Sequence, residues 1–327
     1  MATSGNTSFN LTAANIIQEA LELLGIVSPT EVTDGADYAS CLRSLNMMVK
    51  SWQQKGIFVT HEAEATIFIT PGQMKYILGG SNPSRTAQEP VIEILTSDDY
   101  AATDTAIEVT STTGMTALDV IGIMCDDGTI HWTTIASVDD ATNLTLTVAL
   151  PSGSSSGSYV FSYTDVMGRP LEIEHVAIRR TGGTDLTLSS GLQDQKIHMI
   201  NRDKYLNTYN KGQAGTPVYF HFNQQNTYSE LFVWPTGSRE DERFKITYKR
   251  VIEDFTNSAD TADLPQNWTA CLAYNLAAYV APKYGKEQKA AAAIAPIASQ
   301  LLKDAMADVQ DKSSFKILPR VFDNNGR

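Results

Sequence analysis

The sequence predicts an α+β protein with an N-terminal helical hairpin, an antiparallel sheet, two C-terminal helices and an extended tail, into which a small all-β barrel or sandwich is inserted. Three observations predict this fold class. Apolar residues recur at helical spacing near both ends of the 327-residue chain. Short runs rich in Val, Ile, Thr and aromatic residues fill its middle. One contiguous acidic block accounts for the whole net charge of −12.

Two amphipathic segments at the start of the chain predict the helical hairpin. The first, residues 11–26, has Thr12 as its N-cap and Gly25 as its stop. The second covers about 37–55. Apolar residues recur every three to four positions in both, so each helix should bury one face. The alternating residues that follow predict strands up to about residue 78.

The acidic block predicts a separate domain. Residues 86–168 contain twelve acidic residues and no Lys or Arg, whereas the remainder contains 25 of each sign. Within the block lie five short strand-like runs separated by turn residues such as Asp127-Gly128. We therefore expect an inserted acidic β domain at 89–166. The core domain would then be formed by 1–88 together with 167–311.

Mixed charge returns at Arg169, and further elements can be assigned from there. Residues 170–180 predict a strand, and residues 194–212 predict a helix that ends at Gly212. Three runs within 217–250 alternate apolar and polar residues. These runs predict three strands of one antiparallel sheet.

Two C-terminal helices are expected to complete the core domain. The first lies within 264–285, "LPQNWTACLAYNLAAYVAPKYG", and should cover the sheet predicted just before it. The second, roughly 286–311, is Ala-rich and contains Pro296, which is awkward inside a helix. Tyr279 lies on the expected buried face of the first helix, whereas Tyr274 and Tyr284 lie off it. Tyr274 and Tyr284 are therefore candidate subunit-interface residues, because aromatic residues are enriched in interface cores.

The last residues, 312–327, have no helical face but contain apolar side chains and a local charge of +3. Such a segment suits an extended arm that docks into a groove or onto a sheet edge of a partner. The alternative is that it packs on its own domain. The candidate docking residues are Phe315, Lys316, Ile317, Leu318, Pro319, Arg320, Val321 and Phe322.

A search for chemistry finds no nucleophile, metalloprotease or phosphate-loop motif, and the five histidines are scattered. We expect no cofactor, no metal site and no catalytic residue. The pairs Asp126-Asp127 and Asp139-Asp140 could hold Ca²⁺, but acids in turns are the commoner explanation. A carboxylate pair for glycoside hydrolysis stays open, because the block offers many acids. No run of about 20 apolar residues predicts a membrane helix, and no secretory signal is expected.

Five short stretches carry a family resemblance through their order along the chain. They are the helical hairpin beginning "IIQEALELLGI", then "TPGQMKY", "GRPLEIEHVAIRR", "LFVWPTG" and "DLPQNWTACLAYNLAAYVAPKYG". In this order they resemble the head-to-tail adaptors of short-tailed bacteriophages, also called tail accessory, packaged-DNA stabilisation or head completion proteins. The resemblance covers about 11–88 and 167–310. The acidic domain departs from the simplest pattern of that family.

The resemblance implies a structural virion protein of the neck, made in the bacterial cytoplasm. It implies a homo-oligomeric ring, typically of twelve copies, below the portal protein, with C-terminal arms reaching the portal and a tail nozzle or tail-fibre protein below. Genome double-stranded DNA would pass through without specific binding. Two other functions stay open at this stage. One is a cell-wall (peptidoglycan) hydrolase that uses a carboxylate pair, and the other is a glycan- or protein-binding decoration module.

Overall fold

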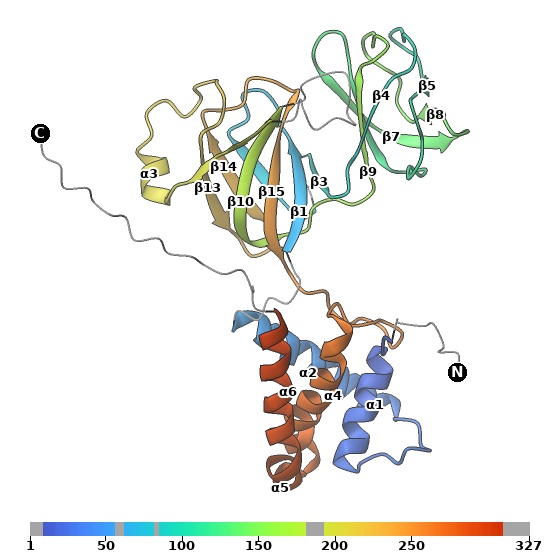
Figure 1. The fold of residues 1–327 in the computed structure, drawn as a ribbon, viewed down its shortest axis with the longest axis vertical. Helices are drawn as coiled ribbons and strands as arrows, with labels where there is room; N and C mark the ends of the chain where they lie inside the picture. The colour runs from blue at the N-terminus through green and yellow to red at the C-terminus, as the bar shows by residue number, and fades with distance from the viewer. Residues whose placement is uncertain (1–8, 56–61, 82–84, 181–192, 310–327) are drawn as a thin grey trace, which may run out of the picture. The chain divides into compact units, whose positions relative to one another are not determined.

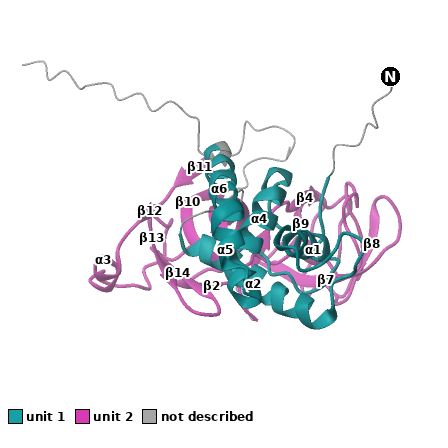
Figure 2. Ribbon diagram, turned by 90° about the horizontal axis from the view of Figure 1, so that it is seen from below, with its two compact units in different colours: residues 1–60, 252–327 teal, residues 61–251 magenta. Residues whose placement is uncertain are grey.

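The computed structural model describes residues 9–55, 62–81, 85–180 and 193–309. The chain divides into two compact units (Figures 1 and 2). One is helical and combines the described parts of 1–60 and 252–327, and the other is β-rich and spans 61–251. This mixed α+β architecture with several sheets and C-terminal helices confirms the predicted fold class in its coarse form. The division at 88/89 and 166/167 stays a prediction.

The helical unit contains both the N-terminal and the C-terminal helices. They share one apolar core, which includes Ile16, Leu45 and Leu276. The helices are α1 (Ala13–Leu24), α2 (Gly35–Gln54), α4 (Thr269–Val280), α5 (Glu287–Lys289) and α6 (Ala295–Val309), with short 3₁₀ segments η2 (Gln266–Trp268) and η3 (Ala281–Tyr284) and a π-helical segment η4 (Ala290–Ile294).

The termini of α1 follow from local chemistry. The Thr12 hydroxyl accepts a hydrogen bond from the Asn15 amide, and Gly25 adopts the left-handed conformation (φ 68°) that ends the helix. Asp34 caps α2 in the same way through the Ala36 amide. The predicted cap and stop of the first helix are therefore confirmed. The hairpin itself is matched only in part, because both helices pack against α4 as well as against each other.

Helix α4 is the inner helix of this unit and contacts α1, α2 and α6. The prediction that it covers the sheet of 217–250 is therefore wrong. Leu272 and Leu276 are fully buried, and so are Ala273 and Ala277 on the adjacent face. The small alanines allow neighbouring helices to approach closely on that side. Tyr279, expected on the buried face, is instead 45% exposed.

The last helix accommodates Pro296 by changing its geometry. A π-helical turn, Ala290–Ile294, precedes α6, and Pro296 then occupies the first turn of α6. The helix is continuous through this point, since the Ala295 amide donates to the Ala290 carbonyl, and the π-helical turn falls directly before the proline, which has no amide hydrogen to donate. The predicted C-terminal helix is therefore present, with an irregular turn before the proline.

The β-rich unit contains fifteen strands and one short helix among the described residues. They form three sheets, with the orders β11-β10-β15-β1-β3, β12-β13-β14-β2 and β4-β9-β6-β7-β8-β5. Their bounds are β1 (Glu62–Phe68), β2 (Lys75–Leu78), β3 (Thr86–Gln88), β4 (Ile92–Leu95), β5 (Ala106–Glu108), β6 (Val120–Met124), β7 (Ile130–Val138), β8 (Asn143–Leu146), β9 (Tyr159–Tyr163), β10 (Pro170–Arg180), β11 (Gln193–Lys196), β12 (His198–Met199), α3 (Arg202–Leu206), β13 (Tyr219–Gln224), β14 (Ser229–Trp234) and β15 (Glu242–Arg250).

The first two sheets pack face to face around a shared apolar core. Strand β15 shows the alternation that makes this possible, because Phe244, Ile246 and Tyr248 point into the core while the residues between them are polar. The predicted single sheet of 217–250 is wrong. β13 and β14 do pair, but β15 lies between β1 and β10 in the other sheet. Strands that follow one another in sequence need not be neighbours, so local periodicity could not decide this pairing.

Most of the helix predicted within 194–212 is also absent. The segment forms β11, β12 and the five-residue helix α3. Ile197 and Ile200 are both buried, which keeps 197–200 against the strands. Asn201 then caps α3 by accepting a hydrogen bond from the Lys204 amide, 2.8 Å away.

The third sheet contains all five strand-like runs predicted in the acidic block, as β5 to β9, together with β4. It curls until its edges meet. The Thr110 amide donates to the Leu95 carbonyl (3.0 Å) and the Ser97 amide donates to the Glu108 carbonyl (2.9 Å). This barrel-like closure pairs edge groups that an open sheet would expose. The predicted turn at Asp127-Gly128 is confirmed, with Gly128 at φ 82° between β6 and β7.

The chain enters and leaves the β-rich unit through adjacent strands. It enters at β1 and leaves at β15, and these strands pair with Glu62 opposite Lys249. The two ends of the unit therefore lie side by side, as is typical of an insertion into another domain. No helix within the described ranges is long and apolar enough to cross a membrane.

Candidate interaction surfaces

The outer face of the five-stranded sheet carries several charged side chains that form ion pairs. Because side chains alternate along β15, Arg243, Lys245 and Lys249 all point away from the apolar core. Lys249 forms ion pairs with Glu172 and Glu174 of β10, each at 3.0 Å. The face is therefore a row of paired charges rather than a free cationic stripe.

Two further ion pairs, made by Arg243 and Lys245, join the sheet to the chain that leads into the barrel. Arg243, whose side chain is 2% exposed, pairs with Glu93 and lies over the Phe161 ring, 5.1 Å from its centroid. Burial lowers the pKa of the Arg243 guanidinium. Lys245 pairs with Glu89. Both pairs are largely removed from water, so each base holds an acidic residue of the block against the sheet.

Glu89 shows how these pairs hold their charge. Burial alone would raise the pKa of its carboxyl group, but hydrogen bonds from Lys245, Thr66 and the Val91 amide outweigh burial and lower that pKa. Glu89 therefore stays ionised and paired near neutral pH.

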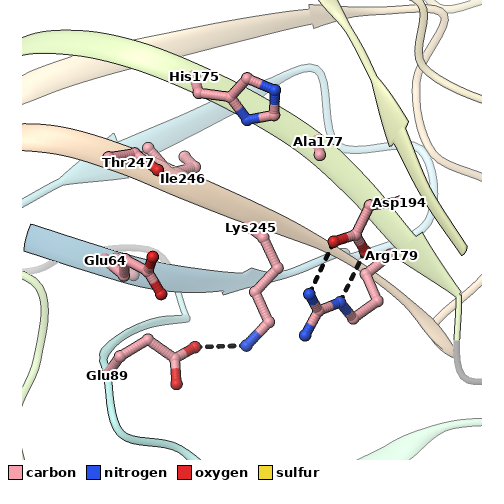
Figure 3. A pocket seen from close by; sticks show the side chains of 10 residues that line it. Glu64, Glu89, His175, Ala177, Arg179, Asp194, Lys245, Ile246 and Thr247 are labelled. Atoms are coloured by element: carbon pink, nitrogen blue, oxygen red, sulfur yellow. Dashed lines mark hydrogen bonds and ion pairs between the residues drawn. The ribbon is translucent and has the colours of Figure 1, made fainter. Parts of the chain in front are cut away.

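A pocket of about 310 Å³ opens on this charged face. Figure 3 shows Lys245 directed toward Glu89, and Arg179 paired with Asp194 through two hydrogen bonds of 2.7 Å each. The hydrogen bonds to Arg179 lower the pKa of the Asp194 carboxyl. The pocket is lined by Glu64, Ala65, Glu89, His175, Ala177, Arg179, Asp194, Lys245, Ile246 and Thr247.

The pocket offers little to a hydrolase. A general acid in glycoside hydrolysis needs a raised carboxyl pKa, yet the pKa values of Glu89 and Asp194 move down. The side chains of Glu64 and His175 form no hydrogen bond or ion pair within the described residues, so these two side chains of the pocket can contact a partner. The arrangement suits recognition of polar groups on another chain.

The acids of the barrel serve as local turn caps. Asp127 accepts hydrogen bonds from the Thr129 amide and hydroxyl, and Asp140 accepts them from the amides of Thr142 and Asn143. These bonds lower the pKa of both carboxyls. They support the turn explanation over a Ca²⁺ site. No group of three or more His, Cys, Asp or Glu with a metal-binding arrangement occurs in the part of the chain that the structure describes.

The predicted interface tyrosines both lie in the helical unit. Tyr284 is half-buried, and its hydroxyl donates to Asp37 at 2.9 Å. Burial raises the pKa of this hydroxyl, and its contacts with Cys41 and Asp37 raise it further. Tyr274 is half-buried against the helical core. Their assignment to a subunit interface stays a prediction, while Tyr279, which sequence reasoning placed inside, is the most exposed tyrosine of α4.

The candidate docking arm, 312–327 with its apolar residues Phe315 to Phe322, lies outside the described residues. Its docking role stays a prediction.

The chain therefore combines a helical unit made from both chain ends with an inserted β-rich unit, and its charged residues lie mainly in ion pairs on the sheet and in turns of the barrel. The model of the SU10 adaptor protein family matches residues 129–320, more than half of the chain, and the protein belongs to this bacteriophage adaptor family. None of the curated proteins compared with the chain matches it. The matched region begins at β7, so it includes the second half of the barrel as well as α4 and α6.

Proposed function

We propose that the protein is a head-to-tail adaptor of the virion neck, which forms a ring below the portal protein and connects the capsid to the tail. The match to the adaptor family over 129–320 carries this proposal. Membership implies association with other virion components. The proposal adds four parts to this: the ring, its copy number of about twelve, the portal contact and the DNA channel.

The charge distribution supports passage of DNA without specific binding. Lys and Arg contacts to phosphates make DNA binding strong and salt-dependent. Here the best placed bases of the sheet, Arg179, Arg243 and Lys245, are already paired with acids. An acidic or charge-balanced lining would let double-stranded DNA slide through the ring.

A closed ring needs a head-to-tail contact between two different surfaces of each copy. In the helical unit, Tyr279 on α4 and Ile297 on α6 are 45% and 47% exposed, and both are side chains that an interface would bury. Tyr274 and Tyr284 belong to the same helical segment as Tyr279. The proposal assigns these tyrosines to the edge of a subunit contact.

The direct test is labelling of purified virions. Antibodies against the protein should mark the neck in negative-stain electron micrographs, and the protein should copurify with portal protein. Label on the capsid shell or on the fibre tips, or a protein that never associates with portal, would overturn the adaptor assignment.

A second test concerns the C-terminal arm. Deletion of 312–327 should leave the circular dichroism spectrum and thermal stability of the protein unchanged, because the arm is proposed to dock on the portal. Portal binding in a pull-down should fall by at least about tenfold, since several apolar side chains would be lost. Loss of folding would instead show that the arm packs on its own unit.

The barrel is proposed to be a separable domain, 89–166. If it only decorates the ring by binding host glycans or a neighbouring virion protein, a chain lacking 89–166 should still be incorporated into the neck, whereas loss of incorporation would show that the barrel takes part in assembly. The hydrolase alternative has no specific support from the pocket on the charged face, and zymography on peptidoglycan tests it. Activity that is abolished by Glu64→Gln would favour that alternative over the adaptor.

A further inference from the structure

The β-rich unit has two oppositely charged surfaces at its two ends. The first is the excursion that carries α3, residues 195–218, which contains four bases and one acid in a chain of net charge −12. We call it the cationic lobe. In both Figure 1 and Figure 2, α3 lies at one end of this unit and β8 at the opposite end, with β5 beside β8 in Figure 1.

The cationic lobe is held rigidly on the four-stranded sheet. Tyr205 of α3 is 5% exposed and packs on His221 and Phe232, with ring centroids 6.1 Å and 5.3 Å away. The Lys211 ammonium group donates to the Leu206 carbonyl at 2.9 Å and closes the loop after α3. The bases of the lobe are therefore presented from a fixed frame rather than from a loose loop.

The outer side of the lobe has the composition of an interface. Met199 is 58% exposed, Leu206 55% and Tyr209 93%. Arg202 and Lys204 flank them, are exposed, and form no ion pair within the described ranges. Aromatic residues, Met and Arg are the residues enriched in protein–protein contacts.

The second surface lies on the barrel where its edges meet. Asp98, Asp104 and Glu108 lie around Tyr100: the Glu108 amide donates to the Tyr100 hydroxyl at 2.6 Å, and Asp104 accepts from the Ala101 amide at 2.8 Å. Burial raises the pKa of Tyr100, a hydrogen bond with the Glu108 backbone lowers it, and the three carboxylates raise it further. Asp139 and Asp140 adjoin them, because Asp140 binds Asn143, the partner of Glu108 in the β5–β8 ladder. We call these five acids the acidic seam. None of them forms an ion pair with another residue of the described chain.

We infer that the cationic lobe of one copy docks on the acidic seam of the next copy around the ring. Opposite charge at opposite ends of one unit is the arrangement that a heterologous, head-to-tail contact requires. The exposed Tyr209 and Leu206 would supply the apolar centre of the contact, and the ion pairs would fix its register. This inference rests on the proposed ring, and it names the surfaces that build it.

The test exchanges the charges. Arg202→Glu/Lys204→Glu reverses the charge of the cationic lobe. Asp98→Lys/Glu108→Lys reverses the charge of the acidic seam at two carboxylates that do not cap a long loop. The control matched to the lobe reversal, Lys289→Glu/Lys303→Glu, makes the same charge change on exposed residues of α5 and α6. Self-association of the full chain is measured by sedimentation velocity over a concentration series at low and physiological salt. Circular dichroism confirms that each variant is folded.

The wild type and the control should self-associate, more weakly as salt rises. Each reversed variant alone should need at least about tenfold more protein to associate, because like charges would then face each other. An equimolar mixture of the two reversed variants should recover association, since alternating copies place a reversed lobe against a reversed seam and a native lobe against a native seam. Arg202→Gln/Lys204→Gln should show a smaller loss than the reversal.

Three results would overturn the inference: a wild type that does not self-associate, reversed variants that associate like the wild type, or a mixture that does not recover. Each of these leaves the adaptor assignment to be judged separately by the virion labelling. A protein absent from the neck would overturn the proposed function, even if the charge exchange behaved as described.

Discussion

At the residue scale, the contact between the barrel and the two face-to-face sheets depends on buried ion pairs that sequence patterns do not reveal. Arg243 and Glu93 are 150 residues apart, and their side chains are 2% and 19% exposed. A buried base that loses its partner keeps the cost of leaving water without the attraction that offset it. The acidic block has no Lys or Arg of its own, yet two of its acids, Glu89 and Glu93, are paired with bases of the sheet.

Glu93→Gln should lower the free energy of unfolding of the β-rich unit by about 3 kcal/mol, because it leaves the Arg243 guanidinium buried without a counter-ion. Urea denaturation measures the loss. Glu108→Gln, at an exposed barrel carboxylate without an ion pair, is the control and should change stability by less than about 0.5 kcal/mol.

The double variant Glu93→Gln/Arg243→Met removes the stranded charge, so it should be more stable than Glu93→Gln alone. Equal stability of the two variants would show that the pair contributes nothing beyond its individual side chains.

The pair of Glu89 with Lys245 predicts a pH dependence. Since the folded-state pKa of Glu89 lies below its unfolded value, its stabilisation is complete above about pH 5 and is lost as the pH falls through the folded pKa. The difference in unfolding free energy between wild type and Glu89→Gln should therefore be largest at pH 7 and shrink below about pH 4. A difference that stays constant from pH 7 to pH 3 would contradict this linkage.

At the element scale, close approaches between strands decide which substitutions the barrel tolerates. Gly122 of β6 lies beneath the indole of Trp132, its partner on β7, and an added Cβ would lie 2.7 Å from that ring. Trp132 in turn packs edge-on against Phe68 of β1, at 4.6 Å between centroids. A glycine in a strand is unfavourable by itself. Here the missing side chain leaves room for Trp132, which packs the barrel against β1 of the neighbouring sheet.

Gly122→Ala should destabilise the β-rich unit by about 1–3 kcal/mol, because the indole must move from its packed position. The matched control is Gly168→Ala, where an added Cβ meets nothing within 4 Å. The control should be neutral or slightly stabilising, by up to about 1 kcal/mol, through the lower entropy of its unfolded chain. Thermal denaturation compares the two, and equal effects would rule out the steric explanation.

At the scale of the whole molecule, the two units have separate cores. The helical core contains only residues of the two chain ends, and the three other clusters lie between Ala63 and Tyr248. The ends of the β-rich unit meet at paired strands, Glu62 opposite Lys249. A unit with its own core and adjacent ends can be excised without cutting through packed structure.

A fragment of residues 62–251 should therefore fold by itself. Its far-ultraviolet circular dichroism should be that of a β protein, and its melting transition should match one of two transitions in calorimetry of the full chain. An unfolded fragment, or a single shared transition in the full chain, would show that the units depend on each other.

The sequence by itself determined the helix caps at Thr12 and Gly25, the five strands of the acidic block with the turn at Asp127-Gly128, the mixed α+β class and the adaptor family. These features depend on neighbouring residues or on the order of short motifs, and both are written along the chain. Only the tertiary structure decided that β15 joins β1 and β10, that α4 packs among helices, and that Arg243 and Glu93 meet. Such contacts between distant segments depend on which buried faces and charges complement each other in space, and periodicity is the same whichever partner a strand or helix finds.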